Sequence, residues 1–171
     1  FAMLIIFAGL PGVGKSTLAK ELARKLSATY VRIDTIEQSI RNSNIINADE
    51  FINSGYGYII GYALVEENLK IGKIVVADSV NSIALTRDAW LEVADKSNVK
   101  AIEIEVICSN PIEHKGRVES RKVDISDLKL PDWQKVMSRE YEEWTRDHII
   151  IDTANSTVED SVAILWSTLG L

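Results

Sequence analysis

Short apolar runs alternate with longer stretches of mixed character along this chain. The runs are rich in Ile and Val, and continuous apolar runs of this length are typical of strands that are buried on both faces. Strands that alternate with helical stretches predict a parallel sheet with crossover helices, and hence an α/β fold. The five runs expected to form strands are Leu4–Ala8, Tyr30–Ile33, Lys73–Ala77, Ala101–Ile107 and His148–Ile151.

The stretches between these runs carry apolar residues at helical spacing. Before the last of them, Ser156 and Glu159 lie three residues apart, a spacing that predicts a capping box. Two irregular insertions, Asn42–Gly57 and Val123–Pro131, are expected to be the most mobile loops. The predicted helices are Thr17–Lys25, Thr35–Arg41, Tyr58–Lys70, Leu85–Asp95, a basic stretch around Pro111–Lys122, Trp133–Trp144 and Val158–Leu169.

The segment that follows the first predicted strand reads Gly-Leu-Pro-Gly-Val-Gly-Lys-Ser-Thr, which fits the phosphate-loop pattern of Gly, four residues and Gly-Lys-Ser/Thr. Its glycines allow backbone N–H groups to face a polyphosphate, and the next helix adds its positive end. Lys15 is expected to reach the outer phosphates, and the Ser16 hydroxyl to hold Mg²⁺. The predicted nucleotide-binding residues of this loop are Gly9, Pro11, Gly12, Val13, Gly14, Lys15, Ser16 and Thr17.

The same segment does not fit the fingerprint of a dinucleotide-binding protein. That fingerprint, Gly-x-Gly-x-x-Gly/Ala, ends on a small residue that allows close packing of helix and strand. Thr17 stands in that position here. The sequence therefore disfavours a nicotinamide cofactor.

Composition, charge and cysteine content limit the kind of protein that we expect, its partners and its compartment. The chain has 171 residues, 46% of them hydrophobic and 26% charged, which is typical of one soluble domain over residues 1–171. Its apolar runs are too short to span a membrane, and its net charge of −6 argues against nucleic acid as a partner. Cys108 is the single cysteine and no signal-peptide pattern is visible, so we expect a cytoplasmic protein, either a monomer or a homodimer.

Two aspartates end predicted strands, where the ligand of an open parallel sheet is expected. Asp34 follows the second strand and could accept the proton of an acceptor hydroxyl; alternatively it caps the helix predicted to begin at Thr35. Asp78 ends the third strand, where a carboxylate could hold Mg²⁺ opposite the Ser16 hydroxyl. The alternative for Asp78 is an ordinary turn residue.

A basic stretch, Lys115–Lys122, falls within a segment of about residues 111–131 that we interpret as a short lid. Arg117 and Arg121 are four residues apart and are expected to share one face of a helix. They could bind phosphates and neutralise charge that develops during transfer. Alternatively, the stretch is a solvated surface on which Glu113 and Arg117 form an ordinary ion pair.

The turn after the last predicted strand, the histidines and a group of aromatic residues are the remaining candidates for functional roles. Asp152 and Thr153 follow the last predicted strand, where a loop beside the nucleotide base is expected, although polar turns before a helix are common. His114 and His148 have no metal-ligand spacing with Cys108, so no zinc site is predicted. Four aromatic residues either line an acceptor pocket or pack in the core: Phe51, Tyr56, Tyr58 and Tyr62.

The phosphate loop alone does not distinguish kinases from switches or motors. A regulatory GTPase carries Asp-x-x-Gly after its third strand and a later Asn-Lys-x-Asp. Here the first position reads Asp78-Ser79-Val80-Asn81, and no Asn-Lys-x-Asp is present. The chain is also too short for a ring-forming motor ATPase with a helical second domain.

What remains resembles the small P-loop kinases grouped around chloramphenicol phosphotransferase, the zeta-toxin kinases and related AAA-like predicted kinases. The resemblance rests on the order of the phosphate loop, Asp34-Thr35-Ile36, Asp78, the Arg117 and Arg121 lid, and Ile151-Asp152-Thr153. It implies a three-layer fold with a five-stranded parallel sheet in the order 2-3-1-4-5 and a short helical lid. It also implies ATP and Mg²⁺ as cofactors, Asp34 as the catalytic base, and Arg117 and Arg121 as groups that bind the nucleotide phosphates.

Polynucleotide kinases of phage type look similar, but they carry an Arg three residues after the Asp to hold an acceptor phosphate. Glu37 occupies that position here, and its charge would repel such a group. We therefore expect an ATP-dependent kinase that acts on a hydroxyl of a neutral or cationic small molecule. The alternatives are a kinase of nucleosides, nucleotide sugars or nucleic-acid ends, and a nucleotide-binding switch or toxin-like partner protein.

Overall fold

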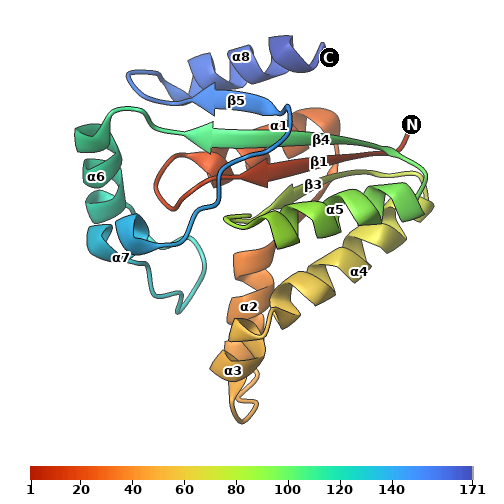
Figure 1. Ribbon diagram of the computed structural model, residues 1–171, viewed down its shortest axis with the longest axis horizontal. Coiled ribbons are helices and arrows are strands. Elements are labelled where there is room, and N and C mark those ends of the chain that lie inside the picture. Colours follow the sequence, from red (N-terminus) through yellow and green to blue (C-terminus); the bar gives the residue numbers. More distant parts are fainter. Residues whose placement is uncertain (171) are drawn as a thin grey trace.

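A parallel sheet of five strands forms the centre of the molecule (Figure 1). The computed structural model describes residues 1–170. The strands lie in the order β2-β3-β1-β4-β5 and all neighbours are parallel, so the predicted fold class and strand order are confirmed. The strands are β1 Met3–Ala8, β2 Thr29–Arg32, β3 Ile74–Asp78, β4 Lys100–Ile107 and β5 Ile149–Asp152.

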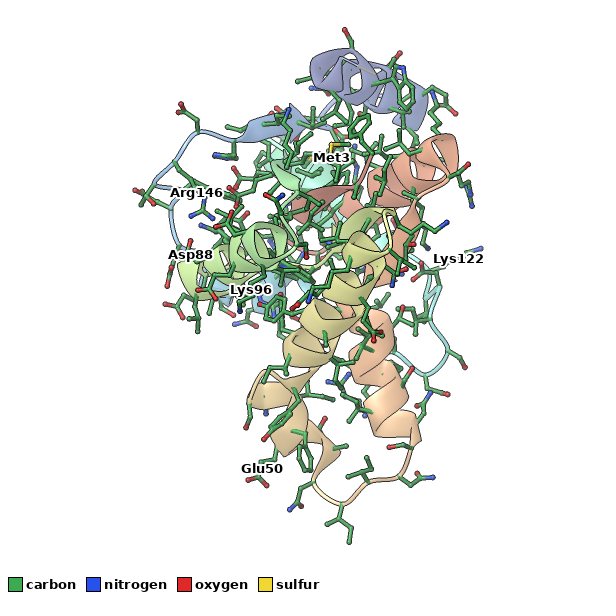
Figure 2. All side chains as sticks on the ribbon, turned by 90° about the vertical axis from the view of Figure 1, so that its right-hand side faces the viewer. Met3, Glu50, Asp88, Lys96, Lys122 and Arg146 are labelled. Carbon is green, nitrogen blue, oxygen red and sulfur yellow. The ribbon has the colours of Figure 1, made fainter. Side chains whose placement is uncertain are left out.

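Helices cover both faces of this sheet, α1 and α8 on one face and α4 and α5 on the other (Figure 1). Two further helices, α6 and α7, lie beyond the carboxyl ends of the strands. An arm made of α2 and α3 projects from the body, with Glu50 near its tip (Figure 2). The helices are α1 Lys15–Leu26, α2 Ile33–Asn42, α3 Ala48–Asn53, α4 Tyr56–Lys70, α5 Ala84–Lys96, α6 Pro111–Ser120, α7 Trp133–Ser138 and α8 Val158–Leu169. Among residues 1–170, no helix has both the length and the apolarity to cross a membrane.

The central strand β1 carries an uninterrupted apolar run because both of its faces are covered. Met3, Ile5 and Phe7 pack in the core layer that contains α1 and α8. Leu4 and Ile6 pack in the layer that contains α4 and α5. A strand of this kind needs no polar alternation. Its carboxyl end leads directly into the phosphate loop.

Strand β4 differs from β1 because carboxylates occupy alternate positions on one of its faces. Glu103 forms an ion pair with Arg146 at 2.7 Å, and the Glu105 carboxylate lies within hydrogen-bond distance of the His148 ring, at 2.8 Å. Arg146 also pairs with Asp88 of α5 at 2.6 Å, and Figure 2 shows these two labelled residues on the same side of the molecule. The segment that leads into β5 therefore covers this part of the sheet with ion pairs where a helix would bring apolar contacts.

The predicted helix Trp133–Trp144 is wrong in its second half. After α7 the chain forms an irregular strap, residues 139–148. The backbone carbonyls of Glu142 and Glu143 accept hydrogen bonds from the buried guanidinium of Arg87, at 2.8 and 3.4 Å. These carbonyls are engaged by a side chain of α5, so tertiary contacts override the local helical propensity.

The start of α2 also differs from the prediction. The helix begins at Ile33 with Arg32 in the N-cap position, and Asp34 lies in its first turn. Asp34 is therefore not the helix cap, which removes one of the two interpretations of this residue. A carboxylate in the first turn of a helix is still favoured by the positive end of the helix dipole.

Two other predicted boundaries need correction. The insertion Asn42–Gly57 was expected to be irregular, but it contains α3 and the first turn of α4. The capping box of α8 is formed by Thr157 and Asp160, one residue later than predicted. The Ser156 hydroxyl bonds instead to a nearby backbone carbonyl. The second insertion, Val123–Pro131, is irregular as predicted.

Candidate active site

The phosphate loop runs from the end of β1 into α1, and its glycines are required by its path. Gly12 and Gly14 have φ values of 84° and 93°, which glycine adopts at little cost. A Cβ on Gly9 would lie 2.4 Å from the Val106 carbonyl oxygen, and one on Gly12 would lie 2.5 Å from Cγ2 of Val118. The motif therefore reflects both the backbone conformation and the close approach of β4 and α6.

Lys15, at the start of α1, is held by a buried carboxylate. Its Nζ lies 2.5 Å from Oδ1 of Asp78, the last residue of β3. The Tyr30 hydroxyl donates to Oδ2 at 2.5 Å. Burial favours the neutral carboxyl, but the charge and hydrogen bond of Lys15, with hydrogen bonds from Tyr30 and Ser16, hold the pKa of Asp78 below its ordinary value. Asp78 is therefore an anion beneath the phosphate loop.

The oxygen atoms at this position fit Mg²⁺ in chemical type. Mg²⁺ prefers hard oxygen ligands and is commonly bound by one or two carboxylates together with substrate phosphates and water. The Ser16 side chain lies close enough to the Asp78 carboxylate to contribute to its lowered pKa, so both groups lie in the same part of the site. These are the two residues that the sequence predicts for the ion.

Arg117 of α6 is engaged by protein groups. Its guanidinium donates to Oγ1 of Thr153 at 2.7 Å and to the Thr153 carbonyl at 2.8 Å. It also forms the ion pair with Glu113 that the alternative interpretation expects. Oγ1 of Thr153 in turn donates to the Val13 carbonyl at 2.7 Å. This chain of hydrogen bonds joins α6 and the turn after β5 to the phosphate loop.

Arg121 does not share a helix face with Arg117, contrary to the prediction. It follows the end of α6 in an extended conformation. Its Nε is buried and has no hydrogen-bond partner among residues 1–170. Burial lowers the pKa of Arg121, whereas the negative charge of Asp34 opposes this shift. Arg121 therefore lies close enough to the candidate base for their charges to interact.

Helix α2 presents two carboxyl groups on one face. Asp34 and Glu37 are three residues apart and both line the same cleft. Gly57 of α4 lies against Glu37, because a Cβ there would be 2.5 Å from the Glu37 Cγ. Burial, reinforced by the charge of Asp34, raises the pKa of Glu37 to about 7. Near neutral pH, Glu37 is partly protonated and can both donate and accept a hydrogen bond.

One cleft joins the phosphate loop to these carboxyl groups. Its volume is about 950 Å³, at the upper end of the usual range for small-molecule sites. It extends from the start of α8, past the phosphate loop and α2, to the segment that follows α6. The predicted site residues that line it are Pro11, Gly12, Gly14, Lys15, Ser16, Thr17, Asp34, Arg117, Arg121 and Thr153.

The remaining predicted residues lie outside the wall of this cleft. Gly9 and Val13 are buried within the loop. Asp78 lies beneath Lys15. The Asp152 carboxylate accepts hydrogen bonds from two backbone N–H groups, those of Ser109 and Ala154, both at 3.0 Å. Asp152 thus stabilises the two loops beside the cleft.

The four aromatic residues of the arm and α4 lie outside the cleft, and two of them pack in the core. Phe51, Tyr56, Tyr58 and Tyr62 are all absent from the lining of the cleft. The Tyr62 ring packs edge-on against the buried Trp90 ring, with centroids 4.5 Å apart. Tyr58 and Tyr62 therefore pack against the core beside α4 and α5, whereas Phe51 and Tyr56 are exposed and contact each other edge-on.

Several charged residues of the site were not predicted from the sequence. Asp124 accepts hydrogen bonds from Arg32 at 2.7 Å and from Lys20 at 2.6 Å, and Arg139 of the strap lines the far end of the cleft. Arg32 could have been noticed, because a charged residue inside a predicted buried strand needs a partner. No local signal pairs it with Asp124, which lies 92 positions later.

Comparison with known protein families shows which family this chain belongs to. Residues 4–143 match the AAA_33 family, described as an AAA domain. The matched region is more than half of the chain and includes the phosphate loop, Asp34, Asp78 and both lid arginines. The chain belongs to this family.

Solved structures share the fold of this AAA_33 domain. A provisionally assigned kinase from Chloroflexus aurantiacus J-10-fl has a TM-score of 0.74 and 18% identity, with 99% of this chain and 96% of the other covered. A sugar kinase from Janibacter sp. HTCC2649 has a TM-score of 0.69 and 15% identity, with 99% and 95% covered. Chaetomium thermophilum Kti12, in complex with ADP-AlF3, has a TM-score of 0.66 and 20% identity, with 96% and 97% covered. The family match thus confirms the expected AAA-like family, and the solved structures confirm the fold shared with small P-loop kinases.

Proposed function

We propose that this AAA_33 domain is a kinase that transfers the γ-phosphate of ATP to a hydroxyl group of a small molecule. The observation that carries the proposal is the cleft that joins a complete phosphate loop to an accessible carboxylate, Asp34. A volume of about 950 Å³ accommodates a nucleotide and a small acceptor together. The structural neighbours support a phosphotransferase, because they include a sugar kinase and a protein bound to ADP-AlF3.

The donor nucleotide would bind at the phosphate loop. Backbone N–H groups and the N-terminus of α1 would face its phosphates, and Lys15 would exchange Asp78 for the outer phosphate oxygens. Mg²⁺, held by Ser16 and Asp78, would supply the charge neutralisation that phosphoryl transfer requires. Thr153 would keep the loop in place through its bond to Val13, and the turn of Asp152 and Thr153 would lie beside the base.

The acceptor would bind beyond the terminal phosphate, against α2. Asp34 would accept the proton of the attacking hydroxyl, as expected for a carboxylate that is 43% exposed and accepts no hydrogen bond from residues 1–170. Arg117 and Arg121 border the same cleft and would neutralise charge that develops on the transferred group.

The two carboxyl groups of α2 favour a small neutral or cationic acceptor over a nucleic-acid end. Glu37 lies one helical turn from Asp34, and at a pKa of about 7 it would hydrogen-bond a hydroxyl or an amine. Asp49 and Asp127 add carboxylates to the same wall, but basic residues line it as well, so the wall as a whole is not negative: Arg41, Arg121, Lys122, Lys129 and Arg139. Repulsion of an acceptor phosphate would therefore come from the carboxylates of α2 next to it.

Release of ADP from Mg-ATP in the presence of acceptor pools tests the proposal. The pools are sugars and polyols, amino sugars, nucleosides, nucleotide sugars and 5′-hydroxyl oligonucleotides. We expect at least one small-molecule pool to stimulate release, and the stimulation to be lost in Lys15→Met and Asp34→Asn. The control Lys100→Met replaces an exposed lysine remote from the cleft and should behave as the wild type.

The competing function is a nucleotide-dependent switch. It would be indicated by a protein that binds Mg-ATP, shows no stimulated release of ADP with any pool, and retains a protein partner only when ATP is bound. That combination of results would overturn the kinase proposal.

A further inference from the structure

Arg32, the last residue of β2, lies among three carboxylates from different parts of the site. Its side chain is only 10% exposed. Nη1 donates to Asp124 at 2.7 Å, whereas Nη2 lies 3.7 Å from Asp34 and Nε lies 3.9 Å from Asp78. The last two separations exceed hydrogen-bond distance, and Nε is buried without a hydrogen-bond partner among residues 1–170. Arg32 is therefore hydrogen-bonded to one carboxylate and coupled to the other two by charge alone.

Asp124 belongs to the lid segment, which we define as residues 121–132 between α6 and α7. The segment has no regular structure of its own, and part of it lines the cleft. Lys20 of α1 donates a second hydrogen bond to the Asp124 carboxylate, at 2.6 Å. Burial opposes ionisation, but the bonds from Arg32 and Lys20 lower the pKa of Asp124 to about 2. One charged side chain thus fastens the lid segment to both α1 and β2.

The arrangement leaves Asp34 free to bind a substrate. A guanidinium carries its N–H donors in a rigid fork and pairs strongly with any carboxylate within reach. With Asp124 in place, the Nη end of Arg32 is held 3.7 Å from the Asp34 carboxylate. Without Asp124, Asp34 would be the nearest carboxylate to Nη2, and a small rotation of the guanidinium would close the gap. The new hydrogen bond would make Asp34 a weaker proton acceptor.

We propose that Arg32 is a positioning residue that couples the lid segment to the base. Docking of Asp124 holds the guanidinium away from Asp34, and release of the lid segment allows Arg32 to cover it. The proposal rests on the proposed kinase function, in which Asp34 accepts the proton of the acceptor. Through this contact the base is available only when the lid segment is docked, which limits transfer of phosphate to water from an open cleft.

Most other charged groups around this contact have partners of their own. Lys15 is paired with Asp78, and Lys20 shares Asp124 with Arg32. Arg121 of the lid segment interacts with Asp34 by charge. Glu37, in the next turn of α2, does so as well. Loss of the Asp124 charge acts through hydrogen bonds on Arg32 and Lys20, and by charge alone on Arg121 and Tyr30. Lys20→Met separates the two hydrogen-bonded effects.

Carboxyl footprinting measures the accessibility of Asp34 and needs no acceptor. Wild type, Asp124→Asn, Arg32→Met and the double variant are treated with a carbodiimide and glycine ethyl ester, and labelling rates are read by peptide mass spectrometry. Glu119 of α6, whose side chain is 57% exposed, is the internal control. We expect Asp124→Asn to slow labelling of Asp34 by about threefold, and removal of Arg32 in the double variant to restore the wild-type rate.

Two results would overturn the proposal: labelling of Asp34 that is unchanged or faster in Asp124→Asn, and a double variant that labels no faster than Asp124→Asn. Lys20→Met cuts the other bond of Asp124 and leaves Arg32 in place, so labelling of Asp34 should stay at the wild-type rate. Far-UV circular dichroism and thermal melting establish that each variant is folded. Arg32→Gln replaces Arg32→Met if the latter unfolds.

Release of ADP separates this coupling from the proposed function. If Asp34→Asn releases ADP as fast as the wild type with the best acceptor pool, Asp34 is not the base, whatever the footprint shows. If Asp34→Asn is inactive but the footprint does not respond to Asp124, the kinase proposal holds and the role given to Arg32 is wrong.

Discussion

The two ends of the cleft are built in different ways. At the proposed donor end, consecutive residues of the phosphate loop form the site through their backbone, supported by one buried ion pair between Lys15 and Asp78. At the proposed acceptor end, side chains from α2, the lid segment and the strap form the lining, such as Asp34, Arg121 and Arg139. The donor end therefore depends on local backbone geometry, and the acceptor end depends on how distant segments pack.

This difference predicts different consequences of substitution. A change at the donor end disturbs buried groups, so it should affect both stability and nucleotide binding. A change to a partly exposed side chain of the acceptor end, such as Asp34, should affect transfer while the fold and nucleotide affinity remain. Glu37 is the exception at this end, because its carboxyl group is desolvated by burial and should also affect stability.

Lys15→Met should have the largest effect because it acts on both chemistry and stability. Loss of the ammonium group should reduce ADP release by about 10³-fold. It also leaves the Asp78 charge buried without its closest partner, which should lower the free energy of unfolding by about 3–5 kcal/mol. Acceptor-stimulated ADP release and urea denaturation measure the two effects.

A double variant serves as the control for this prediction. Lys15→Met with Asp78→Asn removes both charges, so it should recover most of the lost stability and none of the activity. A Lys15→Met protein that is as stable as the wild type would show that the donor end does not depend on this ion pair.

Asp34→Asn should reduce transfer to the acceptor by about 10²-fold, because an amide cannot accept the proton of the attacking hydroxyl. The affinity for Mg-ATP should stay within about twofold of the wild type, since the side chain lies outside the phosphate loop. Calorimetric titration and ADP release with the best acceptor pool give both values. Loss of nucleotide affinity in this variant would contradict the claim that the acceptor end acts on transfer and not on nucleotide binding.

Glu37 should make stability depend on pH. Its pKa rises from 4.5 to about 7 in the folded protein, so the folded state binds the proton more tightly than the unfolded state does. Stability is therefore expected to fall as pH rises from about 4.5 to about 7 and then to level off, by an amount on the order of 2–3 kcal/mol.

Urea denaturation at pH 5 and pH 8 measures this dependence. In Glu37→Gln the decrease between the two pH values should be smaller than in the wild type by most of that amount. Glu119→Gln, on the exposed side of α6, should retain the wild-type dependence. An unchanged decrease in Glu37→Gln would mean that Glu37 does not titrate near neutral pH.

Thr153→Val should have the smallest effect of the four. It removes the hydroxyl that bonds to the Val13 carbonyl and accepts from Arg117, which should cost about 1–2 kcal/mol of stability. A less ordered loop should also weaken Mg-ATP binding several-fold. Thr168→Val, on the exposed end of α8, is the matched control. If the two variants had equal stability and equal affinity for Mg-ATP, Thr153 would not stabilise the phosphate loop.

The same contrast explains what could be predicted from the sequence. The strands were predictable because residues such as Ile5 and Ile6 are buried on opposite faces, and this produces an apolar run that is visible locally. The phosphate loop was predictable because its chemistry is local to one motif. Asp78 was assigned correctly to the end of β3 for a related reason, since a carboxylate directly after a buried run marks the edge of the sheet.

The missed features all depend on contacts between distant segments. The strap lacks the predicted helix because Arg87 of α5 donates a hydrogen bond to the Glu142 carbonyl of the strap. The same guanidinium stacks on Trp144, with its Cζ 4.2 Å from the ring centroid. The contact between Arg32 and Asp124 joins residues 92 positions apart, and neither residue belongs to a recognisable motif. Such pairings follow from the path of the chain in space, and hydrophobic periodicity carries no information about them.

The most direct test of the central claim is an experimental structure with Mg²⁺ and a non-hydrolysable ATP analogue. The claim is that one cleft places a donor phosphate and the Asp34 carboxylate on either side of an acceptor hydroxyl. We expect an Asp34 oxygen to face open space about 3–5 Å beyond the γ-phosphate, within reach of a hydroxyl directly or through one water molecule. A γ-phosphate that points away from α2, or a side chain that fills the space in front of Asp34, would contradict the claim.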